Sequence, residues 1–229
     1  MNEVAWRIRH HPMGFFFTPL DLILSSRSKL RLLRALHATR SPVSGREAAA
    51  AAGIAVQPAQ RALRELVTLG VVRRDGTRSQ HLYTLNRENL LVQGALGQLL
   101  QAEAARVGDV FRDLERAVKR HGKAVEGMYL FGSAARGKDR AGSDFDVVTV
   151  VSAPAHVDAV HGTLAESADP LYSRHGLRLS ALVLDLPKLR KMHQEGDALV
   201  PELLRDNRRI TGKRLEALLH GDAGKQKGS

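Results

Sequence analysis

The stretch that decides the fold is LFGSAARGKDRAGSDFDVVTVV, residues 130–151. The apolar run Met128–Phe131 predicts a short strand, and Gly132-Ser133 must then turn sharply before Ala134-Ala135-Arg136, which suits a helix. A strand that leads into a helix N-terminus presents free backbone N–H groups, and a small or absent side chain lets a phosphate come close. The turn is therefore a candidate cradle for the triphosphate of a nucleotide.

Two carboxylates follow this turn at a strand edge. Asp144 comes eleven residues after Ser133 and is separated from Asp146 only by Phe145, ahead of the apolar run Val147–Val151. Alternate residues of a strand share a face, so both carboxylates should point the same way while Phe145 points into the core. Two such groups repel unless a cation lies between them, and Mg²⁺ favours oxygen ligands. The pattern predicts a metal site, and paired ions about 4 Å apart would suit an in-line displacement at phosphorus.

This arrangement of Gly-Ser, spacer and Asp-x-Asp resembles the polymerase-beta-like nucleotidyltransferase superfamily, most closely its minimal members, over roughly residues 110–220. The resemblance implies that Gly132 and Ser133 hold the nucleotide's phosphates and that Asp144 and Asp146 bind magnesium and are catalytic. It further implies transfer of a nucleoside monophosphate from a nucleoside triphosphate, with ATP expected, to a hydroxyl on a protein, an RNA or a small molecule.

The chain departs from that family at the third carboxylate. Active members place it on the next strand, here Leu177–Leu184, where the aligned position is Ser180 and Asp185 stands at the far end. If Asp185 does not reach the metals, the attacking hydroxyl lacks a general base. The alternative function is then a nucleotide-sensing transcriptional regulator with a degenerate domain. Residues 197–220 resemble the closing helices of the family.

A second phosphate-binding pattern overlaps the first. Gly132, Gly137 and Lys138 fit the start of a P-loop, but Asp139 stands where a hydroxyl is needed for magnesium, so we interpret this match as accidental. Arg136 and Lys138 remain candidates for nucleotide binding as charged groups near phosphate. The alternative is that both are ordinary surface residues.

The first part of the chain predicts three helices and a hairpin. One apolar helical face begins near Ser28, and Ser44 with Glu47 forms the capping box of a second helix. Pro58 is typical of a first helical residue and opens the third helix. Asp75-Gly76 between extended segments indicates a hairpin.

This order, from Leu24 to Asn86, resembles the winged helix-turn-helix family of bacterial repressors, including the passage ALRELVTLGVVRR. The resemblance implies double-stranded DNA as a partner, with the third helix in the major groove and a wing beside it. Two-fold operators in such families favour a homodimer. The residues expected near bases are Gln57, Gln60, Arg61 and Arg64, and those expected near phosphates are Arg73, Arg74 and Arg78. For each arginine the alternative is a solvated face.

Charge and composition agree with this division. The net charge is +11, and residues 1–92 contain 14 Lys and Arg against 6 Asp and Glu, a net +8, so the basic excess lies in the first part. Such a field attracts nucleic acid, although a general preference for arginine would give the same count. The chain has no cysteine, no signal peptide and no apolar run long enough for a membrane span, so we expect a cytoplasmic protein.

We therefore expect an α+β protein with an N-terminal winged helix-turn-helix domain and a C-terminal nucleotidyltransferase α/β domain with a small mixed sheet. The expected segments are an arm (1–23), the DNA-binding domain (24–87), a connecting helix (88–120), the nucleotidyltransferase domain (121–220) and a disordered tail (221–229). The connecting helix should pack on the following domain through one apolar stripe, which consists of Leu96, Leu100, Val107, Phe111, Leu114 and Val118.

Overall fold

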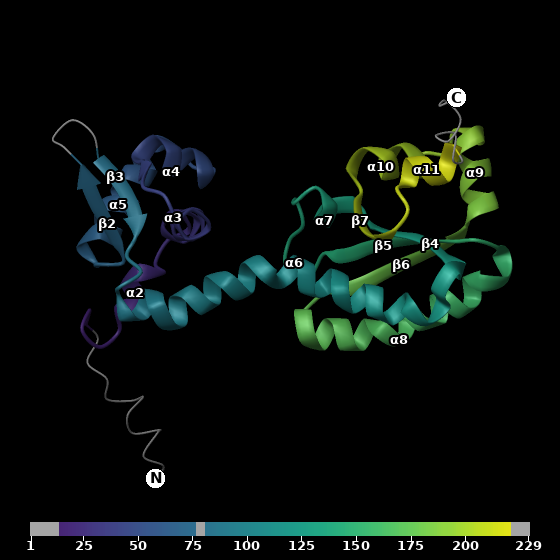
Figure 1. Cartoon of the computed structure of the whole chain (residues 1–229), viewed down its shortest axis with the longest axis horizontal. Coiled ribbons are helices and arrows are strands. Elements are labelled where there is room, and N and C mark those ends of the chain that lie inside the picture. The colour runs from purple at the N-terminus through teal and green to yellow at the C-terminus, as the bar shows by residue number, and fades with distance from the viewer. Residues whose placement is uncertain (1–13, 77–80, 221–229) are drawn as a thin grey trace, which may run out of the picture. The chain divides into compact units, whose positions relative to one another are not determined.

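The computed structural model describes residues 14–76 and 81–220, and the chain divides into two compact units between Ala104 and Ala105 (Figure 1). Helices and small sheets occur in both units, which confirms the expected α+β class. The arm residues 1–13, the tail 221–229 and the hairpin tip 77–80 lie outside the described residues. Within the described residues, none of the helices has the length and apolar character needed to span a bilayer.

The first unit combines short helices with a three-stranded antiparallel sheet of order β1-β3-β2. Its helices pack around a leucine-rich core, to which β3 contributes Tyr83 and Leu85. The elements are α2 (Pro19–Ile23), α3 (Arg27–Ala38), β1 (Val43–Ser44), α4 (Gly45–Ala51), α5 (Val56–Thr68), β2 (Val72–Gly76), β3 (His81–Leu85) and the π-helical turn η1 (Val92–Leu96).

Two local sequence patterns of this unit can be compared with the structure, the capping box and the start of the third helix. The capping box is confirmed, because Ser44 Oγ accepts from the Glu47 amide at 3.3 Å and Glu47 Oε2 accepts from the Ser44 amide at 2.7 Å. The start of the third helix was predicted wrongly. Helix α5 begins at Val56, with Ala55 as its N-cap, so Pro58 is the third helical residue rather than the first. Proline is tolerated there because the first four amides of a helix have no partner within the helix.

The second unit is built around the four-stranded sheet β6-β5-β4-β7. Strands β5 and β6 are parallel and the other neighbours antiparallel, which confirms the small mixed sheet. Its elements are the later part of α6 (Gly97–Val118), η2 (Lys119–Ala124), β4 (Val125–Leu130), α7 (Gly132–Ala135), β5 (Asp144–Val151), η3 (Pro154–His156), α8 (Val157–His175), β6 (Arg178–Asp185), α9 (Leu186–Glu195), α10 (Leu199–Asp206), β7 (Arg208–Gly212) and α11 (Leu215–His220).

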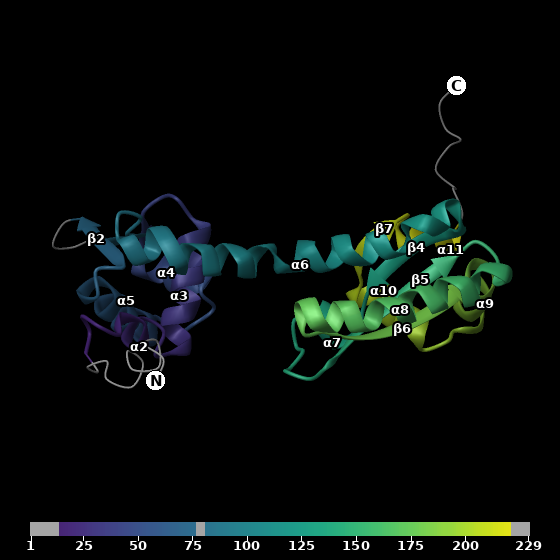
Figure 2. The same ribbon diagram turned by 90° about the horizontal axis from the view of Figure 1, so that it is seen from below.

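Helices cover both faces of this sheet (Figures 1 and 2). One core lies between the sheet and helices α6 and α8, and the other lies between the sheet and helices α9, α10 and α11. Alternate residues of β5 supply the two cores, with Val147 on the α8 side and Val148 on the α9 side. The closing helices expected over residues 197–220 are present as α10 and α11, but Arg208–Gly212 between them forms an edge strand that pairs with β4 and was not expected.

The connecting helix α6 contributes buried residues to the cores of both units. Leu100 is buried in the core of the first unit, whereas Val110, Leu114 and Val118 are buried in the second. Val107, assigned to the buried stripe, is 52% exposed, and Val110 takes the inward position instead. The expected packing on the following domain is confirmed only for the later turns.

Candidate nucleotide and metal site

The turn between β4 and α7 brings the backbone against a carboxylate. Gly132 has a φ of +70°, and a Cβ built on it would lie 2.6 Å from Asp146 Oδ2. The Phe131 amide donates to the Asp146 carbonyl at 3.0 Å, which fixes the turn beside β5. Glycine is thus required both by the left-handed backbone and by the close approach. Because α7 has only four residues, the macrodipole expected at its start adds little.

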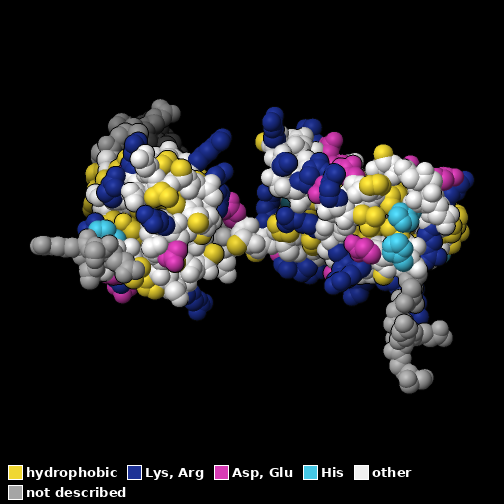
Figure 3. Space-filling view, turned by 90° about the horizontal axis from the view of Figure 1, so that it is seen from above, with side chains coloured by type: hydrophobic (Ala, Val, Ile, Leu, Met, Phe, Trp, Pro, Cys, Tyr) yellow, Lys and Arg dark blue, Asp and Glu magenta, His cyan; other side chains and the backbone are white. Residues whose placement is uncertain are grey.

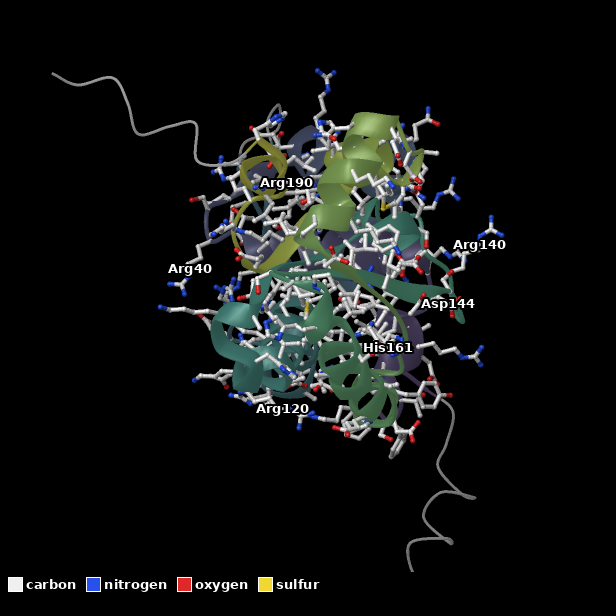
Figure 4. The ribbon with its side chains drawn as sticks, turned by 90° about the vertical axis from the view of Figure 1, so that its right-hand side faces the viewer. Arg40, Arg120, Arg140, Asp144, His161 and Arg190 are labelled. Atoms are coloured by element: carbon white, nitrogen blue, oxygen red, sulfur yellow. The ribbon has the colours of Figure 1, made fainter. Side chains whose placement is uncertain are left out.

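Asp144 and Asp146 open strand β5 on the alternation that the sequence predicts. Phe145 is buried between them, Asp144 is exposed and Asp146 is half-buried. Figure 4 shows Asp144 at the outer edge of the molecule, at the same edge as Arg140 of the loop that precedes it. Both carboxylates therefore lie where a ligand can approach from solvent.

The surroundings of Asp146 disfavour its ionised form. Its pKa is raised, first by desolvation and then by the charges of Asp144 and Glu202; a hydrogen bond from Ser180 and the charge of Arg136 act in the opposite direction. A divalent cation would reverse this balance by favouring the ionised carboxylate. The donor set therefore fits a hard cation.

The position expected for a third carboxylate is confirmed as a hydroxyl. Ser180 pairs in register with Asp146 on the parallel strand β6 and donates to its carboxylate. Asp185 pairs with Val151, five residues further along, or about 17 Å away. Its Oδ1 accepts from the Lys188 amide at 2.8 Å and caps α9, so Asp185 does not serve this site.

Helix α10 supplies carboxylates that the sequence reasoning missed. Glu202 Oε1 lies 3.0 Å and Asp206 Oδ2 3.5 Å from Nη1 of Arg136, so this arginine is held between two acids. Side chains of both charges lie together on the face of the second unit that carries α7 and α10 (Figure 3). Amphipathic periodicity predicts that α10 is a helix, but no local signal links residue 202 to residue 136.

The other residues expected to bind nucleotide, Ser133 and Lys138, differ in burial. Ser133 is half-buried, and its carbonyl accepts from the Lys138 amide at 2.9 Å, while the Lys138 side chain is exposed. Arg208 Nε donates to the Ala135 carbonyl at 3.0 Å and so ties α7 to the edge strand, a role with no sequence signal. In the described part of the chain, no three or more His, Asp or Glu side chains cluster as metal ligands. Magnesium commonly binds through one or two carboxylates plus substrate phosphates and water, so the aspartate pair remains sufficient.

Residues 111–202 match the nucleotidyltransferase domain family. The match contains the turn, both aspartates, Ser180 and Glu202, and it supports nucleotidyl transfer as the general chemistry of this part of the chain. Among solved structures, the chain is similar to a toxin-antitoxin crystallised with AMP-PNP, at 15% identity and a TM-score of 0.31, and to a mutant of the toxin-antitoxin MntA-HpeT, at 12% identity and a TM-score of 0.32. Each alignment covers 48% of this chain and 80% of the other. No curated protein sequence matches the chain.

Outside the nucleotidyltransferase domain, the expected DNA-contacting residues that the structure describes occupy exposed positions. Helix α5 buries Ala59, Ala62, Leu63 and Leu66, and its outward residues are Gln57, Gln60, Arg61 and Arg64. On β2, Arg74 is exposed, whereas Arg73 forms an ion pair with Glu88. Arg78 lies outside the described residues. The face of α5 is thus available to a ligand, while Arg73 is already engaged.

Proposed function

We propose that the chain is a DNA-associated nucleotidyltransferase that moves a nucleoside monophosphate from a nucleoside triphosphate, with ATP preferred, to a hydroxyl of a protein, an RNA or a small molecule. The observation that carries this proposal is the close approach of the Gly132 backbone to Asp146, which sets the glycine turn directly beside the two carboxylates. The family match at residues 111–202 supports the same chemistry.

In this proposal the backbone of Gly132 and Ser133 binds the phosphates, while Arg136 and Lys138 add positive charge. The acceptor oxygen forms a bond to the α-phosphorus, the bond from that phosphorus to the pyrophosphate oxygen breaks, and the hydroxyl proton passes to a carboxylate. Magnesium held by Asp144 and Asp146 would supply neutralising charge. Glu202 is our candidate for the proton acceptor, since its charge acts on Asp146 and it would lose its ion pair if Arg136 turned toward a bound phosphate.

The test is transfer of α-labelled nucleotide, with each base supplied separately, in the presence of magnesium and extract from a bacterial cell. Wild-type chain should label an acceptor, and Asp144→Ala should not. Asp139→Ala is the matched control, because Asp139 is an exposed acid in the same loop. Equal labelling by wild type and Asp144→Ala would refute the enzymatic proposal.

A second function is favoured by Ser180, because a hydroxyl stands where active relatives of the resembled superfamily carry an acid. In this alternative the domain binds nucleotide without turnover and alters DNA binding by the first unit. Coupling between two sites is reciprocal, so nucleotide must change DNA affinity as much as DNA changes nucleotide affinity. Fluorescence titrations at fixed salt check this; unchanged DNA affinity with saturating nucleotide would exclude the sensor.

We further propose that the first unit is a winged helix-turn-helix domain that binds double-stranded DNA, as a homodimer on two-fold sites. The exposed polar face of α5 and the net charge of +8 over residues 1–92 support this. Arg64→Gln should weaken binding by about 1–3 kcal/mol and relax the sequence preference at the base that Arg64 contacts. Arg27→Gln is the control, since Arg27 is an exposed arginine on α3. Equal effects of the two substitutions would indicate non-specific attraction only.

A further inference from the structure

A second charged hollow lies at the other end of the sheet in the same unit. It encloses about 480 Å³ and is lined by the last turns of α6, by η2 and by the end of β7. The cationic side chains in its wall are Arg112, Arg116 and Lys119, and Glu115 is the single acid there. The lining therefore carries three positive charges and one negative.

Arg112 and Arg116 share a face of α6 because helical residues four apart lie one above another, and Lys119 opens η2 directly after this helix. Leu114 on the opposite face is buried in the core, as is Val118, which also borders the hollow, and this packing fixes the orientation of the helix. Glu115 Oε1 accepts a hydrogen bond from Thr211 Oγ1 at 3.0 Å, which links α6 to β7 beside the hollow. The cationic face is thus held on a rigid element.

The acids near this face are already engaged. Arg112 pairs with Asp109. Asp113 accepts from both Arg174 and His175 at 2.8 Å, and Glu126 pairs with Lys213 at 2.8 Å. Among the described residues, neither Arg116 nor Lys119 has an ion-pair partner within 4.0 Å. Arg116 and Lys119 therefore face the hollow without a direct ion pair, although Glu115 lies in the same wall and the charge of Arg116 helps to lower the pKa of Asp113.

Glycine backbone forms part of the wall, at Gly122 and Gly212. Both have positive φ, and a Cβ at Gly122 would meet nothing within 4 Å, so backbone is open to the hollow there. A volume of this size is within the usual range for small-ligand sites. We infer that the hollow binds a compact, multiply charged phosphate compound of about nucleotide size.

This site is separate from the aspartate pair. The hollow includes Val125, which pairs with Val151, whereas Asp146 lies beside Phe131 at the other end of β4. Val151 lies five positions after Asp146 along β5, or about 17 Å away. Figure 4 shows Arg120, which follows Lys119, well away from Asp144. A compact ligand in the hollow cannot react at the aspartates, so it would act as an effector.

The test is a calorimetric titration of the full chain at constant ionic strength. Inorganic tripolyphosphate is the probe, and no magnesium is added. Arg116→Gln/Lys119→Gln should weaken one class of tripolyphosphate site at least tenfold. Lys188→Gln/Lys191→Gln on α9 is the matched control, because it removes the same charge from exposed lysines elsewhere in this unit. Unchanged melting temperatures without ligand would show that both variants are folded.

Three outcomes decide the inference. A selective loss in the Arg116/Lys119 variant supports it. Equal losses in both double variants would overturn it in favour of general electrostatic attraction. If the Arg116/Lys119 variant binds tripolyphosphate as wild type does but binds a single-stranded oligonucleotide more weakly, the inference is also overturned. The hollow would then be part of a nucleic-acid-binding surface. The result is independent of turnover, so it stands or fails separately from the proposed nucleotidyl transfer.

Discussion

Substituting Gly132 by alanine should have two effects that can be measured separately. One is the stability cost of the turn's backbone, and the other is the displacement of Asp146 in the proposed metal site. The alanine must adopt a φ near +70°, which costs an L-residue about 1–2 kcal/mol. Its Cβ would also lie 2.6 Å from Asp146 Oδ2, so the carboxylate has to move. Because that atom ends a short side chain, the shift adds little to the stability cost but displaces a proposed metal ligand.

Gly137→Ala is the matched control, since Gly137 has a φ of +65° but no atom within 4 Å of its built Cβ. Both variants should therefore lose about 1–2 kcal/mol of stability, or roughly 3–8 °C in melting temperature for a unit of this size. Only Gly132→Ala should also lose Mg²⁺ affinity, by at least tenfold.

Differential scanning calorimetry gives the stability of each variant, and Mn²⁺ or Mg²⁺ titration in the presence of a non-hydrolysable nucleotide gives the affinity. Metal affinity of Gly132→Ala within twofold of Gly137→Ala would refute the reasoning, because the contact with Asp146 would then have no part in placing the carboxylate. A stability loss restricted to Gly132→Ala would show that the backbone cost at Gly137 had been overestimated.

Further predictions concern the carboxylates and one helix cap. The pKa of Asp146 is raised, so metal-free protein should lose stability as pH rises through that pKa; Asp146→Asn should abolish this loss in pH-dependent melting curves while removing metal binding. Glu202→Gln should lower transfer about 100-fold, whereas Asp206→Asn, which also removes a partner of Arg136, should change it only a few-fold in the same assay. Ser180→Asp in the Glu202→Gln background should restore transfer if a carboxylate beside Asp146 is what the site requires. Ser44→Ala should cost about 1 kcal/mol in chemical denaturation, because it removes the acceptor of the capping box.

Features set by neighbouring residues could be predicted from the sequence. The capping box, the alternation of Asp144, Phe145 and Asp146, and the glycine turn each depend on a few consecutive side chains. The position of Ser180 beside Asp146 also followed, because a parallel neighbour strand fixes the register once the strands are recognised.

Features set by distant residues could not be predicted. The strand β7 is short and rich in arginine, and only its pairing with β4 makes it extended. Val107 carries an apolar side chain at a helical spacing, yet it falls where α6 passes from one core to the other and is exposed. The ion pairs of Arg136 depend on the packing of α10 against α7, which no local pattern encodes.

The roles of Ser180 and Glu202 decide between the two proposed functions, the nucleotidyltransferase and the nucleotide sensor. A hydroxyl hydrogen-bonded to Asp146 lowers the pKa of that carboxyl without adding negative charge, so it favours cation binding but accepts no proton from an acceptor hydroxyl. Glu202 has the required chemistry but forms an ion pair with Arg136. If the nucleotide's phosphates attract Arg136 away from α10, binding itself releases the base, and the chain is an enzyme that becomes competent only with substrate bound. If Arg136 stays with Glu202 and Asp206, nucleotide and metal bind beside an arginine that is already paired, and the same residues form a sensor. The choice therefore depends on which anion the Arg136 guanidinium prefers.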